Sequence, residues 1–142
     1  MTRVDRVVVN KAQRELLLLA GDSLLRHYRI ALGRNPEGPK TREGDGRTPE
    51  GLYTIDRRNA SSAYHLSLRI SYPSGADRAR AEQLGADPGG DIMIHGLRNG
   101  QGHLGQAHLE KDWTQGCIAV TDEEMDEIWA LVPDGTQVEI NP

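Results

Sequence analysis

The chain contains a single cysteine, Cys117, and this thiol is the side chain best suited to covalent chemistry. It follows Gly116, which lets another group approach the backbone, and it precedes an apolar stretch, so we expect it at the mouth of a strand or turn. A free thiol is only slightly ionised at neutral pH and needs a base or a positive neighbour to react. The pattern favours a nucleophile that moves or hydrolyses an acyl group.

His95 is the best placed of the five histidines to act as that base. It ends an apolar strand expected over 91–95 and is followed by Gly96, where a rigid element would present a side chain at an open edge. By pattern alone, a lone cysteine is more often a small buried hydrophobe and a strand-end histidine more often a structural residue. The wider motif around the two residues must decide between these interpretations.

Composition and charge predict one ordinary domain over residues 1–142. A net charge of -4 with scattered arginines supplies no basic field for a nucleic-acid partner. No run approaches the roughly 18 apolar residues of a membrane span, and Met1–Asn10 lacks the apolar stretch of a signal peptide. We therefore expect neither a nucleic-acid partner nor a transmembrane segment, and a cytoplasmic protein unless a targeting segment lies outside this sequence.

Periodicity predicts a mostly β fold with two short α-helices. Alternating or apolar runs indicate strands over 6–10, 15–20, 24–31, 52–56, 64–72, 91–95 and 136–140. A short helix is expected over 76–84, and Thr121 with Glu124 forms a capping box for a second helix that ends near residue 132. The glycine- and proline-rich segment 33–51 indicates a long surface loop.

The order of several short motifs resembles that of a known enzyme family. His95-Gly96, a glycine-rich stretch and Thr114-Gln115-Gly116-Cys117-Ile118 resemble the signature of the L,D-transpeptidase catalytic domain, the YkuD-like family. The segment 44–53 is similar to that family's entry into a strand, and 112–140 is similar to its YafK-type branch. The resemblance runs from about residue 6 to residue 140, and it implies a β-sandwich or barrel of mixed strands.

The resemblance also implies a reaction and the residues that perform it. A cysteine of this family attacks the carbonyl of a diaminopimelate residue in a peptidoglycan stem peptide and forms a thioester, with no cofactor. Carried over to this chain, Cys117 is the nucleophile, His95 the base, and the Gly96 carbonyl orients the imidazole ring. The backbone N–H groups of Gly116 and Cys117 would stabilise the oxyanion. The implied location is the periplasm or cell envelope, which requires a targeting segment that this sequence does not contain.

Substrate binding is where this sequence departs from its relatives. Many family members have histidine before the Gly-Cys pair and arginine or asparagine two residues after it, whereas this chain has Gln115 and Ala119. The positive groups expected for an acidic substrate must then come from elsewhere. The sequence offers Arg98, Arg69 and Lys111 for this role, and Gln115, Thr114, Tyr72 and Trp113 as further residues of the cleft.

Four functions remain open at this point. The first is a transpeptidase, and the second is an amidase that uses the same site to hydrolyse the link between diaminopimelate and a lysine of an envelope lipoprotein. The sequence does not separate them, because nucleophile and base are shared. The third is a zinc site made from His95, His103, His108 and Cys117, although their spacing follows no familiar ligand pattern. The fourth is a wall-binding module without catalysis, which would not need the thiol.

Overall fold

The computed structural model describes residues 3–142 and contains eight strands and three helices within them. The strands are β1 (Arg6–Asn10), β2 (Glu15–Ala20), β3 (Ser23–Arg29), β4 (Gly51–Ser62), β5 (His65–Ile70), β6 (Met93–His95), β7 (Ile118–Ala119) and β8 (Gln137–Asn141). The helices are α1 (Gly75–Gln83), α2 (Asp122–Leu131) and the 3₁₀-helix η1 (Gly102–Glu110). Met1 and Thr2, where the predicted domain and the stretch considered for a signal peptide begin, lie outside the described residues.

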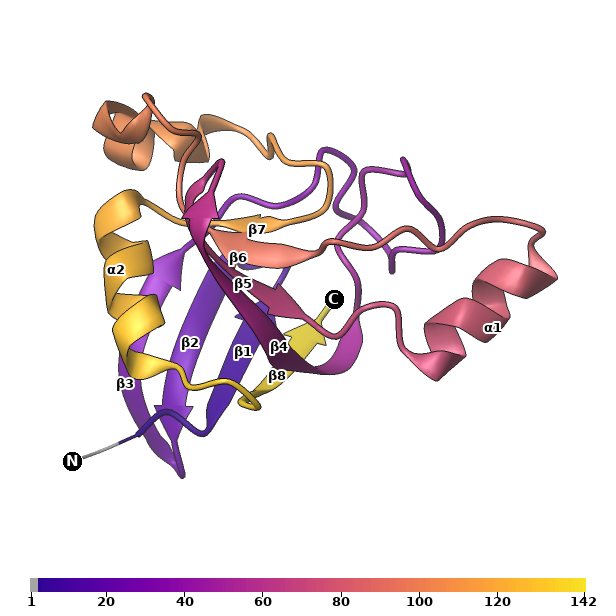
Figure 1. The fold of residues 1–142 in the computed structure, drawn as a ribbon, viewed down its shortest axis with the longest axis horizontal. Helices are drawn as coiled ribbons and strands as arrows, with labels where there is room; N and C mark the ends of the chain where they lie inside the picture. The colour runs from indigo at the N-terminus through magenta and orange to yellow at the C-terminus, as the bar shows by residue number, and fades with distance from the viewer. Residues whose placement is uncertain (1–2) are drawn as a thin grey trace.

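The strands form one mixed sheet in the order β3-β2-β1-β8-β4-β5-β6-β7 (Figure 1). The β1–β8 and β6–β7 pairs are parallel and the other pairs are antiparallel. The first residues of β4 bond to β8 and its later residues bond to β5, so this long strand joins the two halves of the sheet. The backbones of Ala31, after β3, and Ala119, in β7, exchange two hydrogen bonds of 3.0 and 2.9 Å. The two ends of the sheet therefore meet, as in a barrel.

A single apolar core fills the inside of this sheet, and α2 closes one side of it. Alternate residues of the strands point inward, and Val7, Val9, Leu16 and Leu18 are completely buried. On α2, Met125 and Ile128 face the core, and the helix packs against β5 and β6. The Thr121–Glu124 capping box is present at its N-terminus. The predicted mixed, mostly β fold with two short α-helices is confirmed.

Two segments were missed by the sequence prediction, and a third is a loop as predicted but is more firmly held than expected. The second half of β4, over 57–62, was missed because its side chains are polar on an exposed hairpin and show no apolar alternation. Helix η1 was missed because it is short, glycine-rich and kinked at Gly105. The segment 33–51 is a loop as predicted, but Lys40 and Thr48 are buried, and Lys11 Nζ donates to the carbonyls of Gly38 and Thr48. The loop is therefore fixed against the sheet.

None of the helices in residues 3–142 combines the length and apolar character needed to cross a membrane.

Candidate active site

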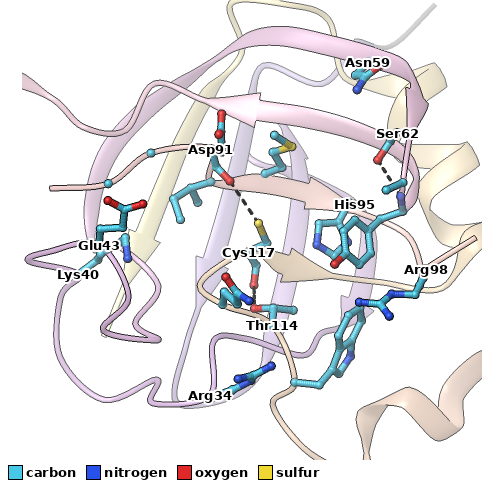
Figure 2. A pocket seen from close by; sticks show the side chains of 18 of the residues that line it. Arg34, Lys40, Glu43, Asn59, Ser62, Asp91, His95, Arg98, Thr114 and Cys117 are labelled. Carbon is cyan, nitrogen blue, oxygen red and sulfur yellow. Dashed lines mark hydrogen bonds between the residues drawn. The ribbon is translucent and has the colours of Figure 1, made fainter. Parts of the chain in front are cut away.

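The parallel pairing of β6 and β7 brings the predicted nucleophile and base to one face of the sheet. Ile94 lies opposite Ile118, and His95 lies opposite Ala119. Continuing this register one residue back sets Cys117 beside Met93. Since side chains alternate between faces, Ile94 and Ile118 point into the core, whereas Cys117 and His95 point to the opposite face and line the same cavity. Figure 2 shows both side chains at this cavity.

The ring of His95 is held in one tautomer and one orientation. Its Nδ1 lies 2.6 Å from the carbonyl oxygen of Gly96, and because a carbonyl only accepts, Nδ1 carries the proton and Nε2 has a free lone pair. The ring of Tyr64 stacks on it with the centroids 4.4 Å apart. Burial lowers the pKa of His95 to about 4, so the imidazole is neutral at pH 7. A neutral, oriented imidazole is suited to accept a proton.

Gly96 is packed closely against Asp122 and His65. Its N–H donates to the carbonyl of Tyr64 over 3.0 Å. A Cβ atom at residue 96 would lie 2.6 Å from Asp122 Oδ1, closer than such atoms approach, and 3.0 Å from His65 Cβ, a tight contact. Asp122 also accepts a hydrogen bond from Leu97 N–H at 2.9 Å. The first residues of α2 therefore fix the backbone that orients His95.

The thiol of Cys117 is protonated at rest and is directed away from His95. Its Sγ donates to the backbone carbonyl of Asp91 over 3.4 Å, and no hydrogen bond joins it to His95 within residues 3–142 (Figure 2). Burial raises the pKa of the thiol, the negative charge of Asp91 adds to this effect, and the Met93 backbone N–H opposes it. The site thus holds a neutral thiol and a neutral imidazole rather than a preformed ion pair.

The turn before Cys117 is built by Thr114 and Gly116. The buried Thr114 hydroxyl donates to the carbonyl of Cys117 over 2.7 Å and accepts from Gly116 N–H over 3.1 Å. Gly116 adopts φ +138°, and a Cβ atom there would lie 2.7 Å from the carbonyl oxygen of Arg47. Thr114 holds the turn and also lines the cavity beside the thiol. The Gly116 N–H, predicted as an oxyanion donor, already has an acceptor, so Cys117 N–H is the remaining candidate oxyanion donor.

The cavity beside the thiol has a volume of about 590 Å³ and carries mixed charge. Of the predicted substrate-binding residues, Thr114, Gln115, Trp113 and Arg98 line it. The sequence did not reveal Arg34, Lys40, Glu43 and Asp91, which line it as well. Arg34 follows the bridge between Gly33 and Thr114, and the loop that carries Lys40 folds back onto the sheet. Such contacts across the chain leave no local pattern in the sequence.

Three predicted cleft residues do not line this cavity. Tyr72 is buried in the core, where its ring packs edge-on against Tyr53 and its hydroxyl donates to the carbonyl of Pro88 over 2.7 Å. Arg69 pairs with Asp56 over 3.0 Å on the neighbouring sheet surface. Lys111 is an exposed residue just after η1. None of the three therefore lines the cavity that holds Cys117 and His95.

An aromatic wall borders the cavity beside His95. Trp113 lies with its ring centroid 5.9 Å from His95 and 6.1 Å from Tyr64. Its indole Nε1 donates to His108 Nδ1 over 3.1 Å, which anchors Trp113 to η1. His108 is buried and His103 is exposed, and no group of three or more His, Cys, Asp or Glu residues among 3–142 is arranged to hold a metal ion.

Comparison with known proteins assigns the chain to a family. The family model described as the L,D-transpeptidase catalytic domain matches residues 4–140. The chain belongs to this L,D-transpeptidase family. The predicted resemblance to this family is thereby confirmed.

Individual relatives of this L,D-transpeptidase domain are longer proteins. YafK of Escherichia coli K12, named as a candidate L,D-transpeptidase, is 32% identical over 112 residues, which is 77% of this chain and 37% of YafK. YqjB of Bacillus subtilis 168, with the same kind of name, is 27% identical over 133 residues, covering 93% of this chain and 68% of YqjB. The crystal structure of the helical cell shape determining protein Pgp2 from Campylobacter jejuni superimposes with a TM-score of 0.74 and 25% identity, covering 98% of this chain and 48% of Pgp2. The chain thus spans about a third to a half of YafK and Pgp2.

The two departures from the family motif have distinct structural settings. Gln115 is exposed and lines the cavity of this L,D-transpeptidase domain, where its amide can reach a substrate. Ala119 is fully buried and its backbone is paired with Ala31, so it brings no charge to the cavity. The cations at the cavity come instead from Arg34, Lys40 and Arg98, on other elements.

Proposed function

We propose that this domain is a cysteine-dependent L,D-transpeptidase that acts on diaminopimelate-containing stem peptides of peptidoglycan through a thioester. The observation that carries the proposal is that Cys117 and His95 lie at adjoining parallel strands and face one cavity. The Gly96 carbonyl holds His95 Nδ1, which leaves Nε2 free to accept a proton. Nucleophile, base and orienting group are the three parts that a cysteine acyl-transfer site needs.

Acylation begins when the thiol turns from Asp91 toward His95. A rotation about the Cα–Cβ bond of Cys117 exchanges one staggered position for another and gives up a single weak hydrogen bond. As Sγ attacks the substrate carbonyl carbon, its proton moves to His95 Nε2. The Cys117 N–H stabilises the oxyanion that forms. When the intermediate collapses, His95 returns the proton to the leaving amine, and the acyl group remains on sulfur as a thioester.

The same groups release the product in the second step. Neutral His95 takes a proton from the incoming amine or water as that nucleophile attacks the thioester carbon. The carbon–sulfur bond then breaks, and the proton passes to the departing sulfur to restore the thiol. Because the pKa of His95 is lowered to about 4, the ring is neutral and ready to accept a proton before each step.

Positive side chains at the cavity support an acidic peptide as the substrate. Arg34 and Arg98 are exposed and line the cavity, and neither guanidinium has an ion-pair partner within residues 3–142. Lys40, by contrast, is engaged by Asp45 at 2.9 Å. We therefore assign the substrate carboxylate contact to Arg34 and Arg98, in place of the arginine that many relatives carry two residues after the cysteine. Trp113 would pack against the apolar part of the stem.

An amidase that hydrolyses the link between diaminopimelate and a lipoprotein lysine is the second function that this site could perform. The similarity to YafK over 77% of the chain favours keeping it, since the segment 112–140 resembles the YafK-type branch. Both reactions share the thioester and differ in whether an amine or water resolves it. Either substrate lies in the cell envelope or periplasm, where we propose that the protein works.

A product assay with matched variants tests the proposal. Purified protein is incubated with tetrapeptide muropeptides and, separately, with lipoprotein-linked muropeptides, and products are separated by chromatography and mass. New cross-linked dimers support transfer, and free lipoprotein supports hydrolysis. Cys117→Ala should abolish both with the fold intact. Unchanged turnover by Cys117→Ala would refute the thiol mechanism and leave the wall-binding module or another catalytic group.

A further inference from the structure

A second groove adjoins the active-site cavity and runs over the outer face of β4 and β5. It has a volume of about 370 Å³, and the residues Asn59, Asp91 and Met93 line both hollows. We propose that this groove binds the amino-acid end of the second peptide, the one whose amine resolves the thioester, with its carboxylate on Arg57 and its ammonium group toward Asp91. The inference rests on the proposed function and names the acceptor subsite of the same active site.

The strand register places the groove in line with the thiol. Arg57 of β4 lies opposite Arg69 of β5, and Arg69 lies opposite Met93 of β6. Met93 in turn lies beside Cys117 by the register of β6 and β7. With neighbouring strands about 4.8 Å apart, this row crosses from the thiol to Arg57 in roughly 14 Å. Long arginine side chains shorten that gap by several ångströms, so an amino acid fits between thiol and guanidinium.

Two arginines face each other across the β4–β5 pair, and this arrangement needs a reason. Like charges directly opposite on one sheet face repel each other and lower stability. Asp56 offsets one of them by pairing with Arg69 over 3.0 and 3.3 Å. Arg57 is exposed, and its guanidinium has no hydrogen-bond or ion-pair partner within residues 3–142. An anion bound at Arg57 would relieve the repulsion, and a planar carboxylate matches the guanidinium fork.

The charges along the groove also have the polarity of an α-amino acid. Asp91 lies where the groove joins the cavity: it lines both hollows, and its backbone carbonyl is 3.4 Å from Cys117 Sγ. Arg57 and Arg69 lie at the far end. An acceptor bound with its ammonium group toward Asp91 and its carboxylate toward Arg57 therefore has its nitrogen nearest the thioester carbon. The side-chain end of diaminopimelate is such a group, because it carries an amine and a carboxylate on one carbon.

The transfer step is balanced in this binding mode. The bound ammonium group first releases one proton to solvent. The resulting amine attacks the thioester carbon, a carbon–nitrogen bond forms, and the carbon–sulfur bond breaks. The second proton passes from nitrogen to His95 and then to the sulfur of Cys117. The products are an amide, a thiol and one proton, with no oxidant or reductant involved.

Binding by the full chain with Cys117→Ala tests the groove without turnover. The ¹⁵N-labelled variant is titrated with diaminopimelate and with 1,5-diaminopentane, which has the same amines and no carboxylate, and amide shifts are followed by NMR. We expect diaminopimelate to shift the amides of Arg57, Arg69 and Asp91. Adding Arg57→Gln should raise the Kd for diaminopimelate about tenfold, because one charge-assisted hydrogen bond is lost. The Kd for 1,5-diaminopentane should stay unchanged, because this ligand has no carboxylate.

The control is Arg29→Gln, an exposed arginine on β3 that lines neither the groove nor the cavity, and it should change neither Kd. The acceptor subsite would be overturned if no amide shifts appeared on β4 and β5, or if Arg57→Gln weakened the binding of both ligands equally. The map of shifts in Cys117→Ala decides this point even where Arg57→Gln fails to fold. If diaminopimelate binds at Arg57 but the wild-type protein forms no thioester, the proposed function fails and the site stands. If transfer proceeds equally well with Arg57→Gln, the site fails and the function stands.

Discussion

Lowering the pH should destabilise the protein through His95, and the size of the effect follows from its burial. The folded protein keeps this imidazole neutral with a pKa of about 4, against an ordinary value of 6.5 for an unfolded chain. Between these two values the unfolded chain binds a proton that the folded protein refuses. Stability is therefore complete above pH 6.5 and is lost as the pH falls toward 4. Between pH 7 and pH 4.5 the loss is about 2 kcal/mol, a large share of the stability of an ordinary domain.

The assay is urea unfolding of the wild-type protein and of His95→Gln at half-unit steps from pH 7 to pH 4.5. Glutamine has no proton to gain, so the variant should lose less stability over this range. The drop in unfolding free energy from pH 7 to pH 4.5 should be about 2 kcal/mol larger for the wild-type protein than for His95→Gln. His108, whose pKa is also lowered by burial, and the carboxylates act equally in both proteins and cancel in the difference. Parallel curves would refute a neutral, desolvated His95 and with it the general-base role.

Three further predictions concern the residues around the thiol. Gly116→Ala places a Cβ atom 2.7 Å from the Arg47 carbonyl oxygen and should lower the unfolding free energy by about 2 kcal/mol or more. Gly90→Ala, whose Cβ atom would have no neighbour within 4 Å, is the control and should not lower it. Calorimetry distinguishes the two variants, and equal melting temperatures would contradict the packing argument. Thr114→Val removes both hydrogen bonds of the turn and should lower the unfolding free energy by roughly 1–3 kcal/mol and also lower kcat. Unfolding and product assays measure the two effects. Full stability and turnover would show that the hydroxyl is dispensable. Alkylation of Cys117 by iodoacetamide should be slow at pH 7 and accelerate at alkaline pH because burial raises the pKa of the thiol, and a fast rate that is flat from pH 6 upward would instead reveal a thiolate–imidazolium pair.

The sequence predicted those parts of the fold that leave a local signal. The Thr121–Glu124 capping box placed the start of α2, and apolar runs between turn-like stretches found β1 and β2 with their observed bounds. The second half of β4 escaped because a strand in an exposed hairpin needs no apolar face. Three of its polar residues, Arg57, Arg58 and Asn59, line the second groove.

The candidate site also contains residues that the sequence predicted and residues that only the tertiary structure reveals. Cys117 and His95 were found from a motif, and the structure sets them on one face because β6 and β7 pair in parallel, a fact of tertiary structure. Tyr64 and Arg34 were missed because they reach the site from a hairpin and a loop that are distant in sequence. Tyr72 was misplaced because strand periodicity shows that a residue is buried on one face but not which cavity that face borders.

The central claim is that Cys117 takes up the acyl group of a stem peptide, and the mass of the protein tests it most directly. Wild-type protein is incubated with tetrapeptide stems, quenched in acid and measured intact and after digestion. We predict a stem-derived mass increase, with loss of the terminal residue, that maps to the peptide containing Cys117 and is removed by hydroxylamine. We predict no such increase for His95→Gln in the same time. An adduct on another residue, or turnover without any adduct at Cys117 under conditions that trap thioesters, would contradict the claim.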